Sequence, residues 1–99
     1  MRSRFTAYAV GNVRHLMRTT DPDGPHHRSD RGAWAEALRA YCEAVDFVGL
    51  EVLDARTEGS EAVVHFRAHL SQGGVHRVQE ERSRFRRRQR RWLYIDGKA

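Results

Sequence analysis

The densest group of side chains that could do chemistry lies near the C-terminal end, where six of the eight residues from Arg84 to Arg91 are arginine. Guanidinium groups bind phosphate through a rigid fork of N–H donors, and an exposed aromatic ring beside them can stack on a base. This pattern allows RNA or another polyanion to bind here, with Trp92 or Tyr94 as the stacking ring. The candidate contacts are Arg84, Arg86, Arg87, Arg88, Arg90 and Arg91.

A second candidate is Glu81, which precedes that stretch. A carboxylate buried without a partner is costly and tends to be protonated instead. Two interpretations therefore stay open: Glu81 is a polar group of a ligand pocket, or it pairs with Arg2 or Arg4 and ties an N-terminal helix to a sheet. As the base of an acid–base enzyme it would need Tyr8 or His76 as the acid, although His76 should lie on the opposite face of its strand. No nucleophile motif or phosphate-binding loop accompanies it.

Cysteine and histidine do not form a metal-binding pattern. The single cysteine, Cys42, excludes a disulfide or a cysteine-rich zinc knuckle within the chain. His26 and His27 are adjacent and have no obvious third ligand. His65 and His69 share a strand face, but four strand residues span roughly 13 Å at about 3.3 Å per residue. We expect no bound metal and no cofactor.

The composition describes one domain that fills residues 1–99. Hydrophobic residues make up 39% of the chain and charged residues 31%, with a net charge of +5. Seventeen of the 18 basic residues are arginine, so only their clustering can argue for a nucleic-acid partner. No apolar run approaches the length of a membrane span, and the first residues lack the apolar segment of a signal peptide. We expect a cytoplasmic protein that does not act at a membrane.

Helical patterns fill the first half of the chain. Apolar residues at helical spacing predict a helix over Arg2 to Val10, ended by Gly11, and a short second helix that Asn12 caps. Residues 19–32 contain both prolines and no apolar residue, which predicts a loop. Asp30 is a suitable cap for a third helix from about Ala33 to Val45.

Strand patterns fill the second half. Val48, Leu50 and Val52 alternate in a first strand, and residues 62 to 70 alternate clearly in a second. Residues 75 to 97 predict two further strands joined by an arginine-loaded turn. Neither face of the third strand is cleanly apolar, which indicates a polar cavity wall on one side and solvent on the other.

Helices before strands predict an α+β fold with three N-terminal helices packed on a curved four-stranded antiparallel sheet. Such a sheet leaves a small conical pocket, with Arg4 near its mouth. The predicted pocket residues are Arg4, Tyr8, Trp34, Glu81, Ser83 and Trp92. The alternative is that the three aromatic residues of this set are simply core.

Several short motifs resemble, in order, the bacterial YchJ-like family. They are RSRFTAY at Arg2 to Tyr8, the Gly11-Asn12 break, VGLEVL at Val48 to Leu53, ERSRF at Glu81 to Phe85 and WLYIDG at Trp92 to Gly97. The resemblance implies a nuclear-transport-factor-2-like (NTF2-like, or cystatin-like) α+β cone whose biochemical activity is unassigned.

Two departures from that family limit the resemblance. Its members commonly carry a zinc-binding SEC-C segment ahead of the RSR motif, whereas this chain begins at Met1 with that motif. The chain is therefore a short paralogue or its native start lies upstream, and no zinc is carried over. Relatives also have an acidic, glycine-containing turn where Arg86 to Arg90 stand here.

The favoured function is a non-catalytic binding module for a small molecule or a protein. Polyanion binding by the arginine stretch and acid–base catalysis by Glu81 are the alternatives. A homodimer through the open sheet face, where His65, Arg67 and His69 would lie, is a further expectation.

Overall fold

All helices precede all strands in the computed structural model, which describes residues 1–99. The elements are α1 (Arg2–Val10), α2 (Val13–Arg18), α3 (Arg31–Ala44), β1 (Asp46–Glu58), β2 (Glu61–Gln72), β3 (Val75–Arg88) and β4 (Arg91–Lys98). The strands form one antiparallel sheet in the order β1-β2-β3-β4. The predicted α+β class is confirmed. No helix is long and apolar enough to cross a membrane.

Local capping sets the helix boundaries. Gly11 ends α1 with a φ of 73°, a left-handed conformation that glycine adopts without steric cost. The side chain of Asn12 accepts a hydrogen bond from the His15 N–H at 3.1 Å and so begins α2. Asp30 accepts one from the Ala33 N–H at 3.0 Å and begins α3. These caps are the ones that the sequence pattern indicates.

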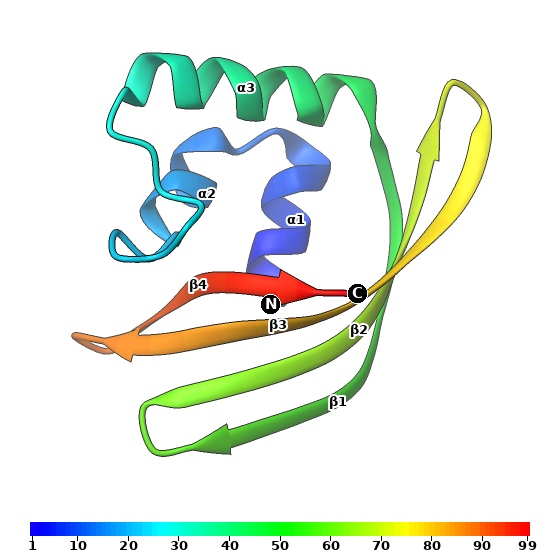
Figure 1. Ribbon diagram of the computed structural model, residues 1–99. Coiled ribbons are helices and arrows are strands. Elements are labelled where there is room, and N and C mark those ends of the chain that lie inside the picture. The colour runs from blue at the N-terminus through cyan, green and yellow to red at the C-terminus, as the bar shows by residue number, and fades with distance from the viewer.

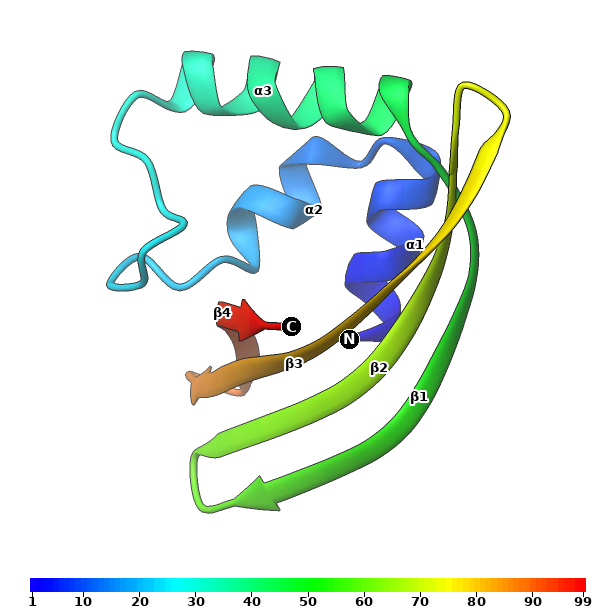
Figure 2. The same ribbon diagram turned by 45° about the vertical axis from the view of Figure 1, so that its right-hand side comes forward.

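The sheet curls around the helices. Figure 1 shows α3 lying across the top of the molecule with α1 and α2 below it, and Figure 2 shows the strands bending around α1 like a hook. On the concave face, Phe66, Ala68 and Leu70 of β2 are buried together with Val45. The alternation of β2 is thus confirmed, and it divides the sheet into an inner face toward the helices and an outer face away from them.

The predicted alternation of Val48, Leu50 and Val52 in β1 is wrong at Val48. Phe47 pairs with Leu70 and Gly49 with His69, so Val48 is the extra residue of a β-bulge. The bulge turns Phe47 and Leu50 to the same face, although they are three residues apart, and leaves Val48 65% exposed.

The β3–β4 hairpin also differs from the prediction. Its turn consists only of Gln89 and Arg90, whose φ angles of 49° and 69° fit a two-residue hairpin turn with both central residues left-handed. The other arginines of the stretch lie on the strands themselves. They therefore alternate between two faces instead of gathering at one tip.

Part of the predicted loop joins the sheet. The Asp21 N–H donates to the Tyr94 carbonyl at 2.8 Å, and the Tyr94 N–H donates to the Thr19 carbonyl at 2.7 Å. Thr20 forms a parallel bridge with Tyr94 in this way. Thr19, Thr20 and Asp21 are all buried. The segment 19–21 thus holds the loop against β4.

Candidate functional site

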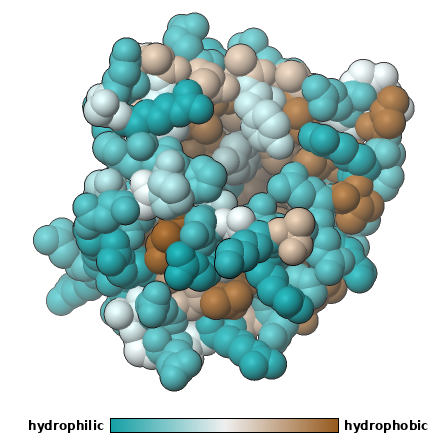
Figure 3. Space-filling model, in the orientation of Figure 1, coloured by the Kyte–Doolittle hydropathy of each residue, from teal (hydrophilic) through white to brown (hydrophobic).

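A cavity of about 430 Å³ lies between the helices and the inner face of the sheet. Its wall is mostly apolar, and all three helices and all four strands contribute to it. In the space-filling view a recess opens beneath α3, with pale and apolar residues inside it (Figure 3). Ligand sites in proteins commonly have this character, an apolar cavity with a few convergent polar groups.

Aromatic rings form one wall of the cavity. The rings of Tyr8 and Phe47 stack with their centroids 5.1 Å apart, and Tyr41 packs edge-on against Tyr8 at 5.9 Å. Trp34 is 5% exposed and also lines the cavity. The His27 ring, from the loop before α3, packs edge-on against Trp34 with the ring centroids 5.1 Å apart.

The polar side of the cavity is built from alternate residues of β3. Glu81 accepts a hydrogen bond from the Ser83 hydroxyl at 2.6 Å and another from the Gln79 amide at 3.3 Å. All three line the cavity. No basic nitrogen lies within 4.0 Å of the Glu81 carboxylate, so the interpretation that it pairs with Arg2 or Arg4 is wrong.

Gly97 explains how this carboxylate is held. It pairs with Ser83 across β3 and β4, and a Cβ atom at position 97 would fall on the Glu81 carboxylate. The absence of a side chain at position 97 therefore leaves the space that the Glu81 side chain occupies.

Arg4 is a buried cation on the opposite side. It is 7% exposed, and its Nη1 donates to the Leu16 carbonyl at 3.1 Å and to the Thr19 hydroxyl at 2.7 Å. Its guanidinium carbon lies 4.6 Å from the centre of the Tyr94 ring, a cation–π contact. Burial lowers the pKa of Arg4 from its ordinary value. The prediction that places Arg4 near the pocket mouth is wrong, since the side chain is inside the fold.

Tyr94 is one of several cavity residues that are missing from the predicted pocket. Its ring contacts Arg4 on one side and lies 5.5 Å from His26 on another. Burial raises the pKa of Tyr94 first, and the nearby charge of Glu81 raises it further. Burial likewise raises the pKa of Tyr8, so both phenols stay protonated at neutral pH. The sequence contains a signal for this position. Residues 92 and 94 are two apart in a strand and share a face, so a pocket that includes Trp92 should also include Tyr94.

Trp92 does not line this cavity. It is 37% exposed and pairs with Arg87 next to the hairpin turn, beyond the part of the sheet that the cavity covers. It lines a separate hollow beside the first two helices. Arg4, Tyr8, Trp34, Glu81 and Ser83 are thus brought together around the cavity, and Trp92 is not.

The arginine stretch is split between paired and unpaired side chains. Arg84 donates two hydrogen bonds to Asp96, at 2.8 and 2.9 Å. Arg86 binds the buried Asp21, and Arg88 binds Asp23. Arg87, Arg90 and Arg91 have no carboxylate within 4.0 Å.

The outer face of the sheet carries a charge network. Glu80 accepts hydrogen bonds from His65 at 2.9 Å and from Arg67 at 2.8 Å, and the rings of His69 and His76 stack at 5.5 Å. His76 is therefore on the opposite side of the sheet from Glu81, as the alternation predicts.

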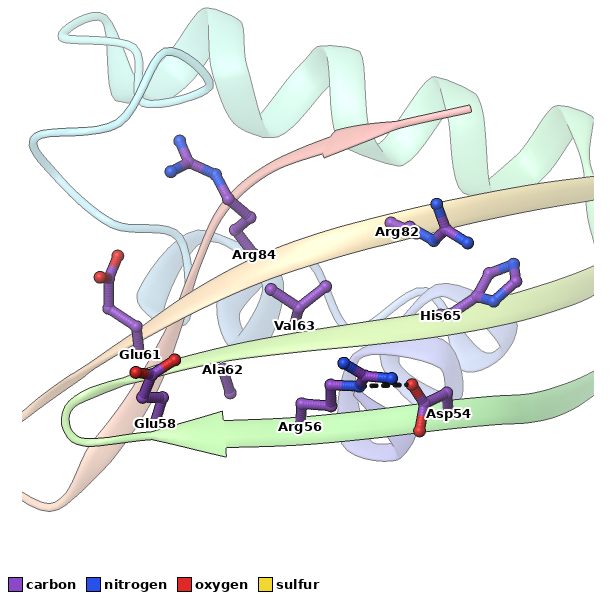
Figure 4. Close-up of a pocket in the computed structure, with 9 residues that line it drawn as sticks. All are labelled: Asp54, Arg56, Glu58, Glu61, Ala62, Val63, His65, Arg82 and Arg84. Carbon is purple, nitrogen blue, oxygen red and sulfur yellow. Dashed lines mark hydrogen bonds and ion pairs between the residues drawn. The ribbon is translucent and has the colours of Figure 1, made fainter.

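An open hollow of about 820 Å³ also lies on this outer face, where Figure 4 shows basic and acidic side chains side by side. Its three carboxylates and three arginines balance in number, and Arg56 pairs with Asp54. Only two of its nine lining residues are hydrophobic. It has neither the apolar wall nor the uncompensated charge of a ligand site.

No group of three or more His, Cys, Asp or Glu side chains converges as a metal site requires. Cys42 is half-buried on α3, and burial raises the pKa of its thiol. A thiol with a raised pKa is a poor nucleophile at neutral pH.

Three helices covering the concave face of a curved antiparallel sheet, with a cavity between the two layers, define an NTF2-like α+β domain. The chain belongs to the family described as YchJ, middle NTF2-like domain, whose sequence model matches residues 1–97. The predicted resemblance is confirmed.

Several relatives are similar over almost the whole chain. A UPF0225 protein of Serratia proteamaculans is 37% identical over 98% of this chain. A SEC-C motif containing protein from Rhodopseudomonas palustris, solved in solution, is 36% identical over 100% of this chain and 74% of its own, with a TM-score of 0.86. A SEC-C motif containing protein from Psychrobacter arcticus shares the fold, with a TM-score of 0.74 at 20% identity over 97% of this chain and 56% of its own. The chain spans about three fifths of the length of the curated relatives, 62% in the first case.

Proposed function

We propose that the domain is a non-catalytic binding module whose cavity holds a small molecule with an apolar, ring-sized body and an N–H or O–H donor. The observation that carries this proposal is the state of Glu81. It lies partly buried on the cavity wall, with no cation within 4.0 Å and only two uncharged side chains as donors.

A carboxylate offers about four acceptor positions, and only two of those of Glu81 are used by Ser83 and Gln79. A ligand donor directed at Glu81 would fill a remaining position. The rings of Tyr8 and Trp34 supply the apolar surface against which the body of the ligand would pack.

The two tryptophans allow a direct test by ¹H–¹⁵N NMR, because Trp34 lines this cavity and Trp92 lines another hollow. Benzylamine and benzyl alcohol are the probes, and benzoate is the matched compound that Glu81 should repel. The two donors should shift the Trp34 indole signal saturably and leave the Trp92 signal in place. Benzoate should have no effect.

Glu81→Gln should weaken benzylamine binding about tenfold, since a hydrogen bond to a charged group is worth roughly 1.5–3 kcal/mol. Glu80→Gln is the matched control, because it makes the same charge change one residue away on the outer face. Equal effects of the two substitutions, or an unmoved Trp34 signal with every probe, would refute the proposal. Circular dichroism on both variants checks that they fold.

The two alternatives have less support. Polyanion binding by the whole arginine stretch would require Arg84, Arg86 and Arg88 to leave their aspartate partners. Acid–base catalysis by Glu81 has less support because His76, one of the two acids considered, lies on the outer face, and the phenol of Tyr8, with its raised pKa, is a weak acid. The imidazole of His26 lines the same cavity but makes no hydrogen bond or ion pair with Glu81.

A further inference from the structure

A second hollow, of about 340 Å³, lies where α1 and α2 meet the β3–β4 hairpin. It has room for roughly ten water molecules at about 30 Å³ each. Five of the residues that line it are basic and none is acidic. They are Arg4, His15, Arg18, Arg90 and Arg91.

The positive charge of this hollow is not neutralised within the protein. Arg18, Arg90 and Arg91 have no carboxylate within 4.0 Å, whereas Arg86 and Arg88 of the same hairpin bind aspartates. The unpaired positive charge of the hairpin is therefore concentrated at the hollow. The aspartates of the loop neutralise one side of the hairpin, and no acid does so on the side of the hollow.

Arg4 gives an independent sign of a missing anion. Its side chain is more than nine-tenths buried, and its partners are a carbonyl, two threonine hydroxyls and the face of Tyr94. Buried charges in proteins are normally paired with an opposite charge, because desolvation is costly. Arg4 lines both cavities. The charge of Glu81, the only acid of the first cavity, acts on Arg4, but its carboxylate is not within 4.0 Å of the guanidinium.

The positive charge around the hollow also affects His15. Its pKa lies below the ordinary value because of burial first, and then because of the charges of Arg18, Arg4 and Arg91. Its Nδ1 faces the Arg18 guanidinium at 3.4 Å, and its Nε2 faces the Ser3 hydroxyl at 3.4 Å. Arg18 can only donate, so this arrangement fits a neutral imidazole with its proton on Nε2, directed at Ser3.

We propose that this hollow binds a phosphate group, either inorganic phosphate or the phosphomonoester end of a small molecule. Arginine forks suit the tetrahedral oxygens of phosphate, and charge-assisted hydrogen bonds of this kind are the strong ones. Trp92, at the rim and 37% exposed, offers a flat surface to the remainder of a phosphomonoester.

The test is an NMR titration of the whole chain at constant ionic strength with inorganic phosphate, adenosine monophosphate and adenosine. The Trp92 indole and the Arg90 and Arg91 amides should shift saturably with phosphate or the monophosphate, while the Trp34 indole stays in place. Tighter binding of the monophosphate would identify a phosphomonoester site, and binding of inorganic phosphate alone would identify a site for the free ion. Equal binding of adenosine and its monophosphate would overturn the proposal.

Substitutions separate a site from a general charge effect. Arg91→Gln and Arg18→Gln, both at exposed residues, should each weaken phosphate binding about tenfold. Arg87→Gln is the control, since Arg87 is exposed, unpaired and outside the hollow. It should change the affinity less than about twofold. If it weakens binding as much as Arg91→Gln, the signal comes from diffuse positive charge and the proposal fails. The same holds if single-stranded RNA binds through all three arginines alike.

Discussion

Glu80 and Glu81 are neighbours on β3 and face opposite sides of the sheet. Glu80, on the outer face, binds Arg67 and His65, and the hydrogen bond from Arg67 is the main reason that its pKa lies below the usual value. Glu81, on the inner face, has only Ser83 and Gln79 as donors. The Glu80 carboxylate has basic partners on the outer face, whereas the Glu81 carboxylate has no basic partner on the inner face.

The same difference separates the two sides of the β3–β4 hairpin. Arg86 and Arg88 are neutralised by Asp21 and Asp23, but Arg91 is not. A charged residue therefore carries little information by its type alone. Both binding sites that we propose lie where a charged side chain has no ion-pair partner within the protein.

The largest expected contrast between the two sheet faces concerns packing. Phe66→Ala on the inner face should lower the free energy of unfolding by about 3–5 kcal/mol, because it leaves a void in the core. Val63→Ala on the outer face, where Val63 is 39% exposed, should change it by less than about 1 kcal/mol. Urea denaturation measures both. Similar losses would mean that the outer face is also covered, as in a dimer.

The next largest effect is expected at the buried ion pair. Asp21→Asn should cost about 3 kcal/mol at neutral pH, the low end for breaking a buried pair, since Arg86 is partly exposed. Asp23→Asn is the control, because Asp23 is 67% exposed and its ion pairs are worth little.

This pair also predicts a dependence on pH. Burial alone would raise the pKa of Asp21, but the Asp23 N–H and the Arg86 guanidinium outweigh it and hold the pKa below the usual value. The unfolded chain therefore takes up the proton first. The contribution of Asp21 is complete above the unfolded pKa of about 3.9 and is lost as the pH falls through the lower folded pKa. Denaturation from about pH 5 to about pH 2 should show a steeper loss in the natural chain than in Asp21→Asn; parallel curves would contradict the assignment.

The smallest effect tests the position of Glu81 without changing its charge. Gly97→Ala places a methyl group on the Glu81 carboxylate, which must move, at a cost of about 1–2 kcal/mol. The variant should also lose the benzylamine-induced shift of Trp34. Gly49→Ala on the outer face is the control, because its Cβ would meet only the His69 ring at an ordinary 4.0 Å. Unchanged benzylamine binding in Gly97→Ala would show that the Glu81 position is unimportant.

Much of the fold was readable from periodicity. The alternation of β2, the caps at Gly11, Asn12 and Asp30, and the order of helices and strands were each signalled by a few neighbouring residues. Each of these signals depends on residues a few positions apart in the sequence, so it can be recognised without knowing the tertiary structure. The family resemblance added the particular NTF2-like fold, which periodicity does not encode.

The wrong or missing predictions concern features that a short stretch of sequence does not reveal. The bulge at Val48 has no residue signature, and it reversed the facing of that side chain. Trp92 was assigned to the cavity from its residue type, but its place along β4 lies beyond the end of the cavity. The pairing of Asp21 with Arg86 joins residues 65 positions apart, and a loop with two prolines gave no hint of it.

The segment 19–21 and the bulged β1 have a consequence for how the sheet meets other chains. An open sheet has two edge strands whose free N–H and C=O groups can recruit further strands and lead to aggregation. At β4 the backbone of Thr19 and Asp21 occupies groups of Tyr94 that would otherwise be free. At β1, the 13-residue strand is interrupted by irregularities after Phe47 and after Val52, which disturb a straight pairing surface. One edge is covered at Tyr94 and the other is irregular, and we expect both features to hinder strand addition to this arginine-rich sheet.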